Sequence, residues 1–299
     1  MNQPLEPIVD AHHHIWRVAE TPWLNGPPVA RIFGDYGPLR RDYGIDEYLG
    51  AALPAGVTKS VFVQVNVAAG REVAEVAWVQ AVADRCGFPQ AITAYADLAA
   101  PGIAGVLDAE LASGKVRAIR QQLHWHANPL YRYAATANLT EQAAWRQGLR
   151  EVAKRGLLFE LQIFPAQMPA AAHLVRSFAD VTFVLLHAGM LEDRSEEGWA
   201  RWRAGMRALA LCPNVMVKIS GLGTFEHACS TALWRPVVEE TIDLFGPTRC
   251  LFGSNFPIES LWTTYAEVVA AVRQSLLRYG KDERRAVLHD TAMRLYRLA

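Results

Sequence analysis

The chain has 299 residues and a mass of 33.1 kDa, with 51% hydrophobic and 20% charged residues. This composition is typical of a folded globular protein and excludes an intrinsically disordered chain, which needs low hydrophobicity and high net charge. The 30 basic and 30 acidic side chains balance, which argues against nucleic acid or an anionic membrane as the main partner.

The cysteines and the N-terminal sequence bear on location. The four cysteines are scattered and form no CxxC pair, so we expect reduced thiols. The N-terminus has neither the basic nor the apolar region of a secretory signal, and no apolar run reaches the roughly 18 residues of a membrane span. We therefore expect a cytoplasmic protein without a membrane partner.

Short apolar runs alternate with amphipathic stretches along the chain. The apolar runs are nearly continuous, as expected for parallel strands that are covered on both faces. Eight strands are predicted, at residues 8–11, 57–65, 92–96, 116–123, 157–164, 181–187, 215–220 and 250–253. The segment 22–43, rich in proline, glycine and aromatic residues, is predicted to be an ordered excursion after the first strand.

Helical periodicity fills most of the gaps between these strands. Ser195, Thr231 and Asp282 are suitable N-cap residues, because their side-chain oxygens can accept a hydrogen bond from an unpaired helix amide. The predicted helices cover residues 71–86, 140–154, 195–211, 231–245, 265–278 and 282–298. Eight strands alternating with helices predict an α/β fold, a closed (β/α)8 TIM barrel that forms a single domain over residues 1–299.

The end of the first strand carries three consecutive histidines. Reactive groups of such barrels lie at the carboxyl ends of the strands. Alternate residues of a strand face the same side, so His12 and His14 should converge while His13 packs outward. Two convergent imidazoles form half of a metal site.

Two later strands also end in residues suited to chemistry. His187 follows four consecutive apolar residues at the end of the sixth strand, where a buried imidazole needs partners for both ring nitrogens. The eighth strand ends at Asn255, and Glu259 follows in the loop.

The remaining strands contribute polar side chains that predict a polar mouth for a small substrate. Arg120, on the fourth strand, is suited to a substrate carboxylate, and His124 shares its parity. The other candidates are Gln64, Asn66, Asp97, Glu160, Gln162, Lys218 and Ser220. Five aromatic residues near the mouth loops are candidates for an apolar wall: Trp16, Trp23, Trp125, Phe256 and Trp262.

Together, the HxH motif, the FVLLHAG segment, the VKISGL strand and the GSNFP turn resemble the amidohydrolase superfamily. The sequence is most similar to the amidohydrolase-2 group, which contains the sugar-lactone and pyrone dicarboxylate lactonases. The resemblance implies a TIM barrel that hydrolyses a lactone or similar carbonyl ester. It also implies that His12, His14 and His187 belong to a metal or substrate site, with Arg120 as the carboxylate-binding arginine.

Two departures from the family pattern affect the chemistry. Asn255 stands where the superfamily places an aspartate that acts as metal ligand and base, and an amide has almost no basicity near neutral pH. The fifth strand carries Glu160 and Gln162 where a binuclear centre would need a second-metal histidine, so we expect no binuclear centre.

We predict a hydrolase that opens a small lactone bearing a carboxylate or several hydroxyls. In one version, one divalent metal, zinc or manganese, is held by His12, His14 and His187 and lowers the pKa of bound water. In a metal-free version, the imidazoles donate hydrogen bonds to the developing oxyanion. The predicted catalytic residues are His12, His14, His187, Asn255 and Glu259, and the predicted substrate-binding residues are Arg120, His124, Gln162, Gln64 and Lys218.

The general base stays open among Glu259, Glu160 and His124. Two alternative functions also stay open: a decarboxylase or hydratase on the same barrel, and a non-catalytic ligand-binding relative that has lost its base. The expected partner is a small-molecule substrate. A homo-oligomer is left open, because helix 265–278 has a face suited either to the barrel or to another subunit.

Overall fold

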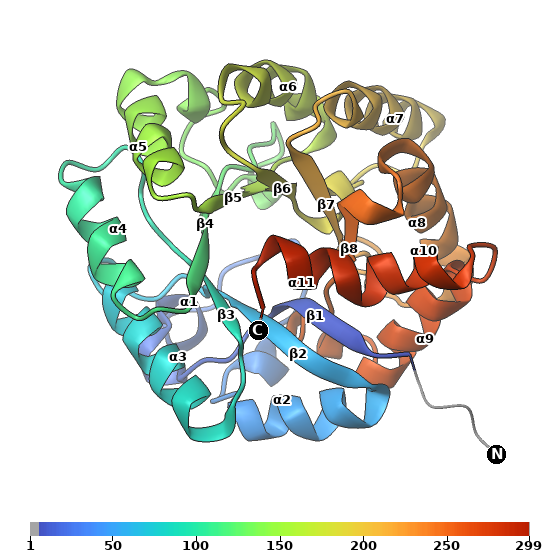
Figure 1. Ribbon diagram of the computed structural model, residues 1–299, viewed down its shortest axis with the longest axis horizontal. Coiled ribbons are helices and arrows are strands. Elements are labelled where there is room, and N and C mark those ends of the chain that lie inside the picture. Colours follow the sequence, from blue (N-terminus) through green and yellow to red (C-terminus); the bar gives the residue numbers. More distant parts are fainter. Residues whose placement is uncertain (1–5, 299) are drawn as a thin grey trace.

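The computed structural model describes residues 6–298 and contains one eight-stranded parallel sheet in the order β1 to β8. The sheet curls into a nearly closed barrel inside a ring of helices (Figure 1). The predicted TIM barrel is therefore confirmed. The strands are β1 (Ile8–His13), β2 (Val57–Val63), β3 (Ala91–Ala94), β4 (Val116–Gln122), β5 (Leu158–Gln162), β6 (Phe183–Leu185), β7 (Val215–Ile219) and β8 (Cys250–Phe252).

The helices alternate with the strands as predicted, but the sequence pattern predicted only some of them. The α-helices are α1 (Pro22–Asn25), α2 (Ile45–Ala52), α3 (Glu72–Cys86), α4 (Ile103–Leu111), α5 (Ala143–Lys154), α6 (Met168–Ser177), α7 (Glu196–Ala210), α8 (Thr231–Phe245), α9 (Tyr265–Ser275), α10 (Lys281–Arg285) and α11 (Thr291–Leu295). Helices α1, α2, α4 and α6 are absent from the prediction, because each has ten residues or fewer and so offers too short a periodic pattern. Within residues 6–298, no helix is both long enough and apolar enough to cross a membrane.

The three N-cap predictions had different outcomes. Ser195 caps α7 and accepts a hydrogen bond from the Gly198 amide, as predicted. The prediction for Thr231 is wrong by one residue, because Ser230 caps α8. The prediction for Asp282 is also wrong, since Gly280 precedes α10 and Asp282 lies inside its first turn.

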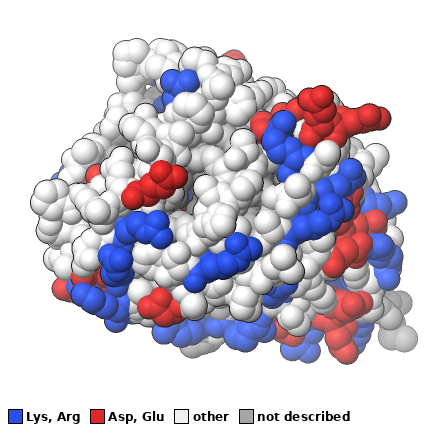
Figure 2. All heavy atoms as spheres, turned by 90° about the horizontal axis from the view of Figure 1, so that it is seen from above, with Lys and Arg blue, Asp and Glu red and all other residues white. Residues whose placement is uncertain are grey.

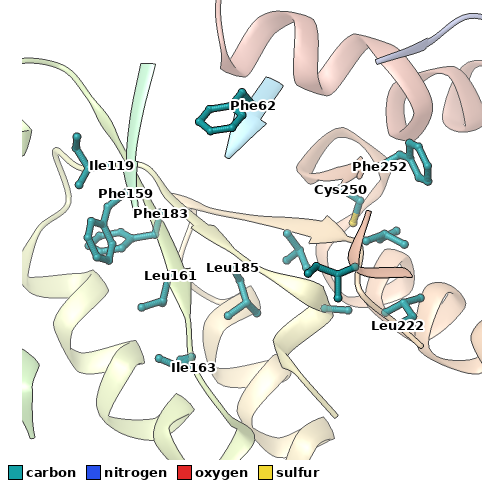
Figure 3. Packing of buried hydrophobic residues seen from close by; sticks show 14 of the residues in the cluster. Phe62, Ile119, Phe159, Leu161, Ile163, Phe183, Leu185, Leu222, Cys250 and Phe252 are labelled. Carbon is teal, nitrogen blue, oxygen red and sulfur yellow. The ribbon is translucent and has the colours of Figure 1, made fainter. Parts of the chain in front are cut away.

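The apolar core has two parts, as a barrel requires. One layer lies between the strands and the surrounding helices, and Figure 3 shows part of it, including Phe159 and Phe183 at a ring-centroid distance of 6.1 Å. A smaller cluster fills the barrel interior with side chains such as Val61 and Val184, and Tyr296 belongs to it. The chain end thus covers one end of the barrel, where α11 lies across it in Figure 1.

Basic and acidic side chains are interspersed on the face of the molecule shown in Figure 2. That face carries no stripe of a single sign. Its mixture of charges follows from the balanced composition.

The barrel closes where the ends of β1 and β8 meet. His14 donates its backbone amide to Phe256 O (2.7 Å), and the Asn255 amide donates to His12 O (2.7 Å). A Cβ atom on Gly253 would lie 2.5 Å from His12 Cβ, so only glycine permits this close approach. The backbone around the histidines of β1 is thereby tied to the end of β8.

A buried carboxylate, Asp10, lies at this junction. Its oxygens accept hydrogen bonds from Ser254 N (2.8 Å), Ser254 Oγ (2.6 Å), Tyr48 Oη (2.9 Å), Tyr265 Oη (2.9 Å) and His12 N (3.1 Å). Burial raises the pKa of Asp10, and these donors act in the opposite direction. One side chain therefore links β1, β8, α2 and α9.

We predict that Asp10→Asn lowers the free energy of unfolding by about 3 kcal/mol. The NH2 group of the asparagine would face the buried N–H and O–H donors that now bind the carboxylate, and those donors would lose their acceptor. Chemical denaturation of the variant and of Asp180→Asn, an exposed aspartate, measures the difference. Equal stability of the two variants would contradict the role given to Asp10.

Candidate active site

A cavity of about 590 Å³ opens at the carboxyl ends of the strands. Seven of the predicted site residues line it: His14, Gln64, Arg120, His124, Gln162, His187 and Asn255. Side chains from β1, β2, β4, β5, β6 and β8, or from the residues that follow them, therefore meet in one space, which is the arrangement expected of a TIM-barrel site.

Three imidazoles converge at the base of this cavity. The ring centroids of His12 and His14 are 5.1 Å apart, and those of His12 and His187 are 4.8 Å apart. His12 lies beneath the other two and does not line the cavity. Both of its ring nitrogens are buried without a hydrogen-bond partner in the described part of the chain.

An irregularity in β1 explains how these histidines are aimed. The register with β2 shifts between Asp10 and His13, so Asp10 faces Tyr48 and Tyr265 of the helices while His12 and His14 face inward. His13 stacks on Tyr48 at 3.8 Å and bonds to Ser60 Oγ at 3.0 Å, so it packs outward as the alternation predicted.

The neighbours of His14 determine where its proton sits. His14 Nδ1 lies 2.7 Å from Val63 O. A carbonyl oxygen only accepts, so Nδ1 carries the hydrogen, and the Nε2 atom of the neutral ring keeps a lone pair. His187 is held at the same ring position, with Nδ1 2.9 Å from Ser220 Oγ.

Burial and nearby cations keep the imidazoles uncharged. Burial and Arg120 lower the pKa of His14 to about 3, and the same causes lower that of His124 to about 3. The pKa values of His12 and His187 are lowered in the same direction, first by burial and then by Lys218 and Arg120. The cavity therefore offers neutral rings that can accept or donate hydrogen bonds.

Arg120 is a buried cation that faces the cavity. Its Nη2 atom donates to Gln64 O (2.5 Å), and Nη1 lies 3.5 Å from Gln162 Oε1. Its Nε atom has no partner in the described residues, and no direct ion pair is formed there. Burial lowers its pKa only to about 10, so it remains charged at neutral pH.

The charged side chains in the described lining of the cavity are all arginines. Three arginines contribute to it, Arg31, Arg120 and Arg132, and the described lining includes no aspartate or glutamate. Aromatic rings cover much of the rest, from Trp16, Trp23, Phe33, Tyr131, Tyr133 and Phe225. The predicted wall residues Trp125, Phe256 and Trp262 do not line this cavity.

Besides His12, the candidates Lys218, Glu160, Glu259, Asp97 and Ser220 lie outside the cavity lining. Lys218 is fully buried and pairs with Glu160 at 2.6 Å. We predicted that Lys218 binds the substrate directly, and this is corrected, because its side chain lies beneath the site. Glu160 also accepts hydrogen bonds from Thr93 Oγ1 and Tyr296 Oη, both at 2.7 Å. Glu259 is fully buried behind Asn255, so neither carboxylate reaches a ligand in the cavity directly.

The predicted metal ligands do not form a metal site as arranged. Within residues 6–298, no group of three or more His, Cys, Asp or Glu side chains is placed to hold an ion. The lysine and arginine that lower the pKa of His12 would also repel a metal cation. Asn255 contributes no negative charge to offset them.

The sequence reasoning overlooked several lining residues. Gln122 has the same strand parity as Arg120, so the alternation of side chains along the strand could have identified it as a lining residue. Arg31 and Tyr133 come from loops whose path over the barrel mouth has no local signature.

A family model for amidohydrolases matches residues 9–298 of the chain. The chain belongs to the amidohydrolase family. It is 35% identical to an uncharacterized protein, y4mH, of Sinorhizobium fredii, over 97% of this chain and 98% of the other. It is 30% identical to L-fucono-1,5-lactonase of Burkholderia multivorans, over 97% and 96% of the two chains.

A solved structure extends the likeness to three dimensions. An amidohydrolase from Burkholderia multivorans, crystallised with bound zinc, is 28% identical and has a TM-score of 0.83, covering 98% of this chain and 100% of the other. The family membership and the barrel are thus supported by sequence and by structure.

The buried Glu259 predicts a pH-dependent stability difference. Burial raises its pKa from 4.5 to about 8. A raised folded-state pKa means that the wild type loses stability as pH rises from about 4.5 to 8, at about 1.4 kcal/mol per pH unit. Glu259→Gln does not titrate, so its stability relative to the wild type should increase across this window and level off above it.

Denaturant unfolding at pH 5, 6.5, 8 and 9 measures this difference, with Glu141→Gln as the exposed control. A constant difference between Glu259→Gln and the wild type across the series would show that Glu259 keeps an ordinary pKa.

Proposed function

We propose that the protein hydrolyses a small lactone that carries a carboxylate. One observation carries the proposal: convergent neutral imidazoles share a cavity with Arg120, a buried cation without a direct ion pair, and no acidic side chain lines that cavity. The 30% identity to a lactonase supports the reaction type.

The charge of the cavity separates two substrate classes. A polyhydroxylated lactone is neutral, so it carries no counter-charge for a buried cation. The described lining offers three arginines, together with amide side chains that suit either class. A bidentate guanidinium matches a carboxylate, so the carboxylated lactone is favoured.

Hydrolysis then needs a base for the attacking water. His14 Nε2 has a lone pair, because Val63 O holds the hydrogen on Nδ1. We assign His14 to take a proton as the water oxygen adds to the lactone carbonyl carbon. The carbonyl electron pair moves onto oxygen, then returns as the ring C–O bond breaks, and the leaving alkoxide takes the proton from His14.

An anionic substrate would also strengthen this base. The pKa of His14 is low partly because of the positive charge of Arg120. Burial is the larger cause of the low His14 pKa, and a substrate carboxylate paired with Arg120 offsets the second cause, so the His14 pKa rises when the substrate binds. Substrate binding and base activation are therefore coupled.

Substitution of Arg120 tests the substrate class. For Arg120→Met, kcat/KM on a carboxylated lactone should fall about 10- to 150-fold, the effect of one lost charged hydrogen bond. A neutral lactone of the same ring size should lose less than about threefold. Arg176→Met, at an exposed arginine, serves as the control, and an equal loss on both lactones would reject Arg120 as a carboxylate site.

Metal removal tests the cofactor. Because the described histidines do not form an ion site and lie beside cations, we expect protein treated with a chelator to keep its full rate. Metal content measured by mass spectrometry verifies the removal. Loss of activity on chelation, restored by zinc or manganese, would contradict this expectation.

Decarboxylation is the second candidate, because a cationic cavity without acids also suits an aryl carboxylate. Product analysis separates the two reactions: hydrolysis releases a hydroxy acid and retains every carbon atom, whereas decarboxylation releases carbon dioxide. Binding without turnover across the panel would identify a ligand-binding protein instead.

A further inference from the structure

The segment that follows β6 runs through four consecutive residues with positive φ. The φ angles are 54° at His187, 47° at Ala188, 76° at Gly189 and 52° at Met190. These values lie in the left-handed region, which is unfavourable for most residues that carry a side chain. Three of the four residues carry one, so the turn is strained and needs support from its surroundings.

This turn decides where the His187 side chain points. Phe183 and Leu185 of β6 belong to the apolar layer between the strands and the helices (Figure 3), whereas Val184 belongs to the cluster inside the barrel. If the chain stayed extended, the alternation of side chains would turn His187 outward, like Leu185. Instead, His187 lines the cavity, and its ring centroid is 4.8 Å from that of His12. The left-handed backbone therefore brings this imidazole to the site.

Trp202, on α7, supports the turn from outside the barrel. Its Nε1 atom donates a hydrogen bond to Ala188 O (2.8 Å), and both residues are fully buried. Helix α7 belongs to the ring of helices around the sheet (Figure 1). Because a buried carbonyl oxygen without a donor is costly, the indole favours the left-handed turn over conformations that point this oxygen elsewhere.

The packing on the other sides of the turn is equally close. A Cβ atom on Gly221, which follows β7, would lie 2.5 Å from His187 Nδ1. A Cβ atom on Gly189 would lie 2.2 Å from Met168 Cε. The ring itself is held by Ser220, whose Oγ atom lies 2.9 Å from Nδ1. The end of β7 thus fixes the ring, and α7 fixes the backbone that carries it.

We propose that Trp202 is a positioning residue of the active site, whose indole N–H holds the left-handed turn that directs His187 into the cavity. Trp202 does not line the cavity, so it acts only through the backbone of the turn. This inference rests on the proposed hydrolysis, because that reaction places the lactone beside the imidazoles that line the cavity.

Trp202→Phe tests this role by activity, because it keeps an aromatic ring and removes the N–H group. On the carboxylated lactone, kcat should fall about tenfold, and KM should hardly change, since Arg120 still binds the carboxylate. Trp234→Phe is the matched control. Trp234 is buried on α8, and its Nε1 atom has no hydrogen-bond partner in the described part of the chain. Equal losses of kcat in the two variants would overturn the proposal.

Ala188→Gly separates the strain of the turn from the packing of the core. Glycine adopts positive φ without strain, so Ala188→Gly in the Trp202→Phe background should restore most of the lost kcat. A tryptophan that only fills the core would allow no such recovery. If Trp202→Phe does not fold, the double variant is measured in its place. A double variant that is as slow as Trp202→Phe, or that also fails to fold, overturns the proposal.

A second measurement needs no substrate. In protein labelled with ¹⁵N-histidine, the His187 ring resonances are assigned by their loss in His187→Ala. The Nδ1 resonance should shift in Trp202→Phe, return when Ala188→Gly is added, and stay in place in Trp234→Phe. Unchanged His187 resonances in Trp202→Phe overturn the proposal even if the enzyme hydrolyses lactones. The expected shifts without any lactone hydrolysis support the positioning of His187 and overturn only the proposed function.

Discussion

The site depends on how the first and last strands of the barrel are joined. Asp10 has no cationic partner among its direct contacts, and its charge is balanced by hydroxyl and amide donors from β1, β8, α2 and α9. The donor Ser254 directly precedes Asn255, and the His12 amide is another donor. The same buried carboxylate therefore fixes the barrel junction and the backbone beside the reactive side chains. These hydrogen bonds bring groups far apart in sequence to one cavity.

A second constraint is electrostatic. Two buried imidazoles, His12 and His14, and the partly buried His187 lie near Arg120 and Lys218, and only Lys218 has a direct anionic partner, Glu160. The free site is thus short of negative charge, and a ligand that supplies it gains affinity and relieves the repulsion that lowers the pKa of His14. Specificity and catalysis then share one cause, since a neutral ligand would leave the base in its weakly basic state.

The sequence predicted the barrel well because eight apolar runs are a strong, repeated signal. Strand parity also placed Arg120, Gln162 and the two inward histidines, because side-chain direction follows directly from the period of a strand. It could not place Glu259 or Arg31, whose positions depend on loop conformation. Nor could it show that Lys218 is paired with Glu160 below the cavity, since that contact joins β5 and β7 across the barrel interior.

The most direct test of the account is a crystal structure with the open-chain product of a carboxylated lactone. The account predicts one carboxylate on the Arg120 guanidinium and the newly formed acid group beside His14. A product bound elsewhere, or bound in the cavity with Arg120 free of it, would contradict the assignment of this cavity as a site for anionic lactones.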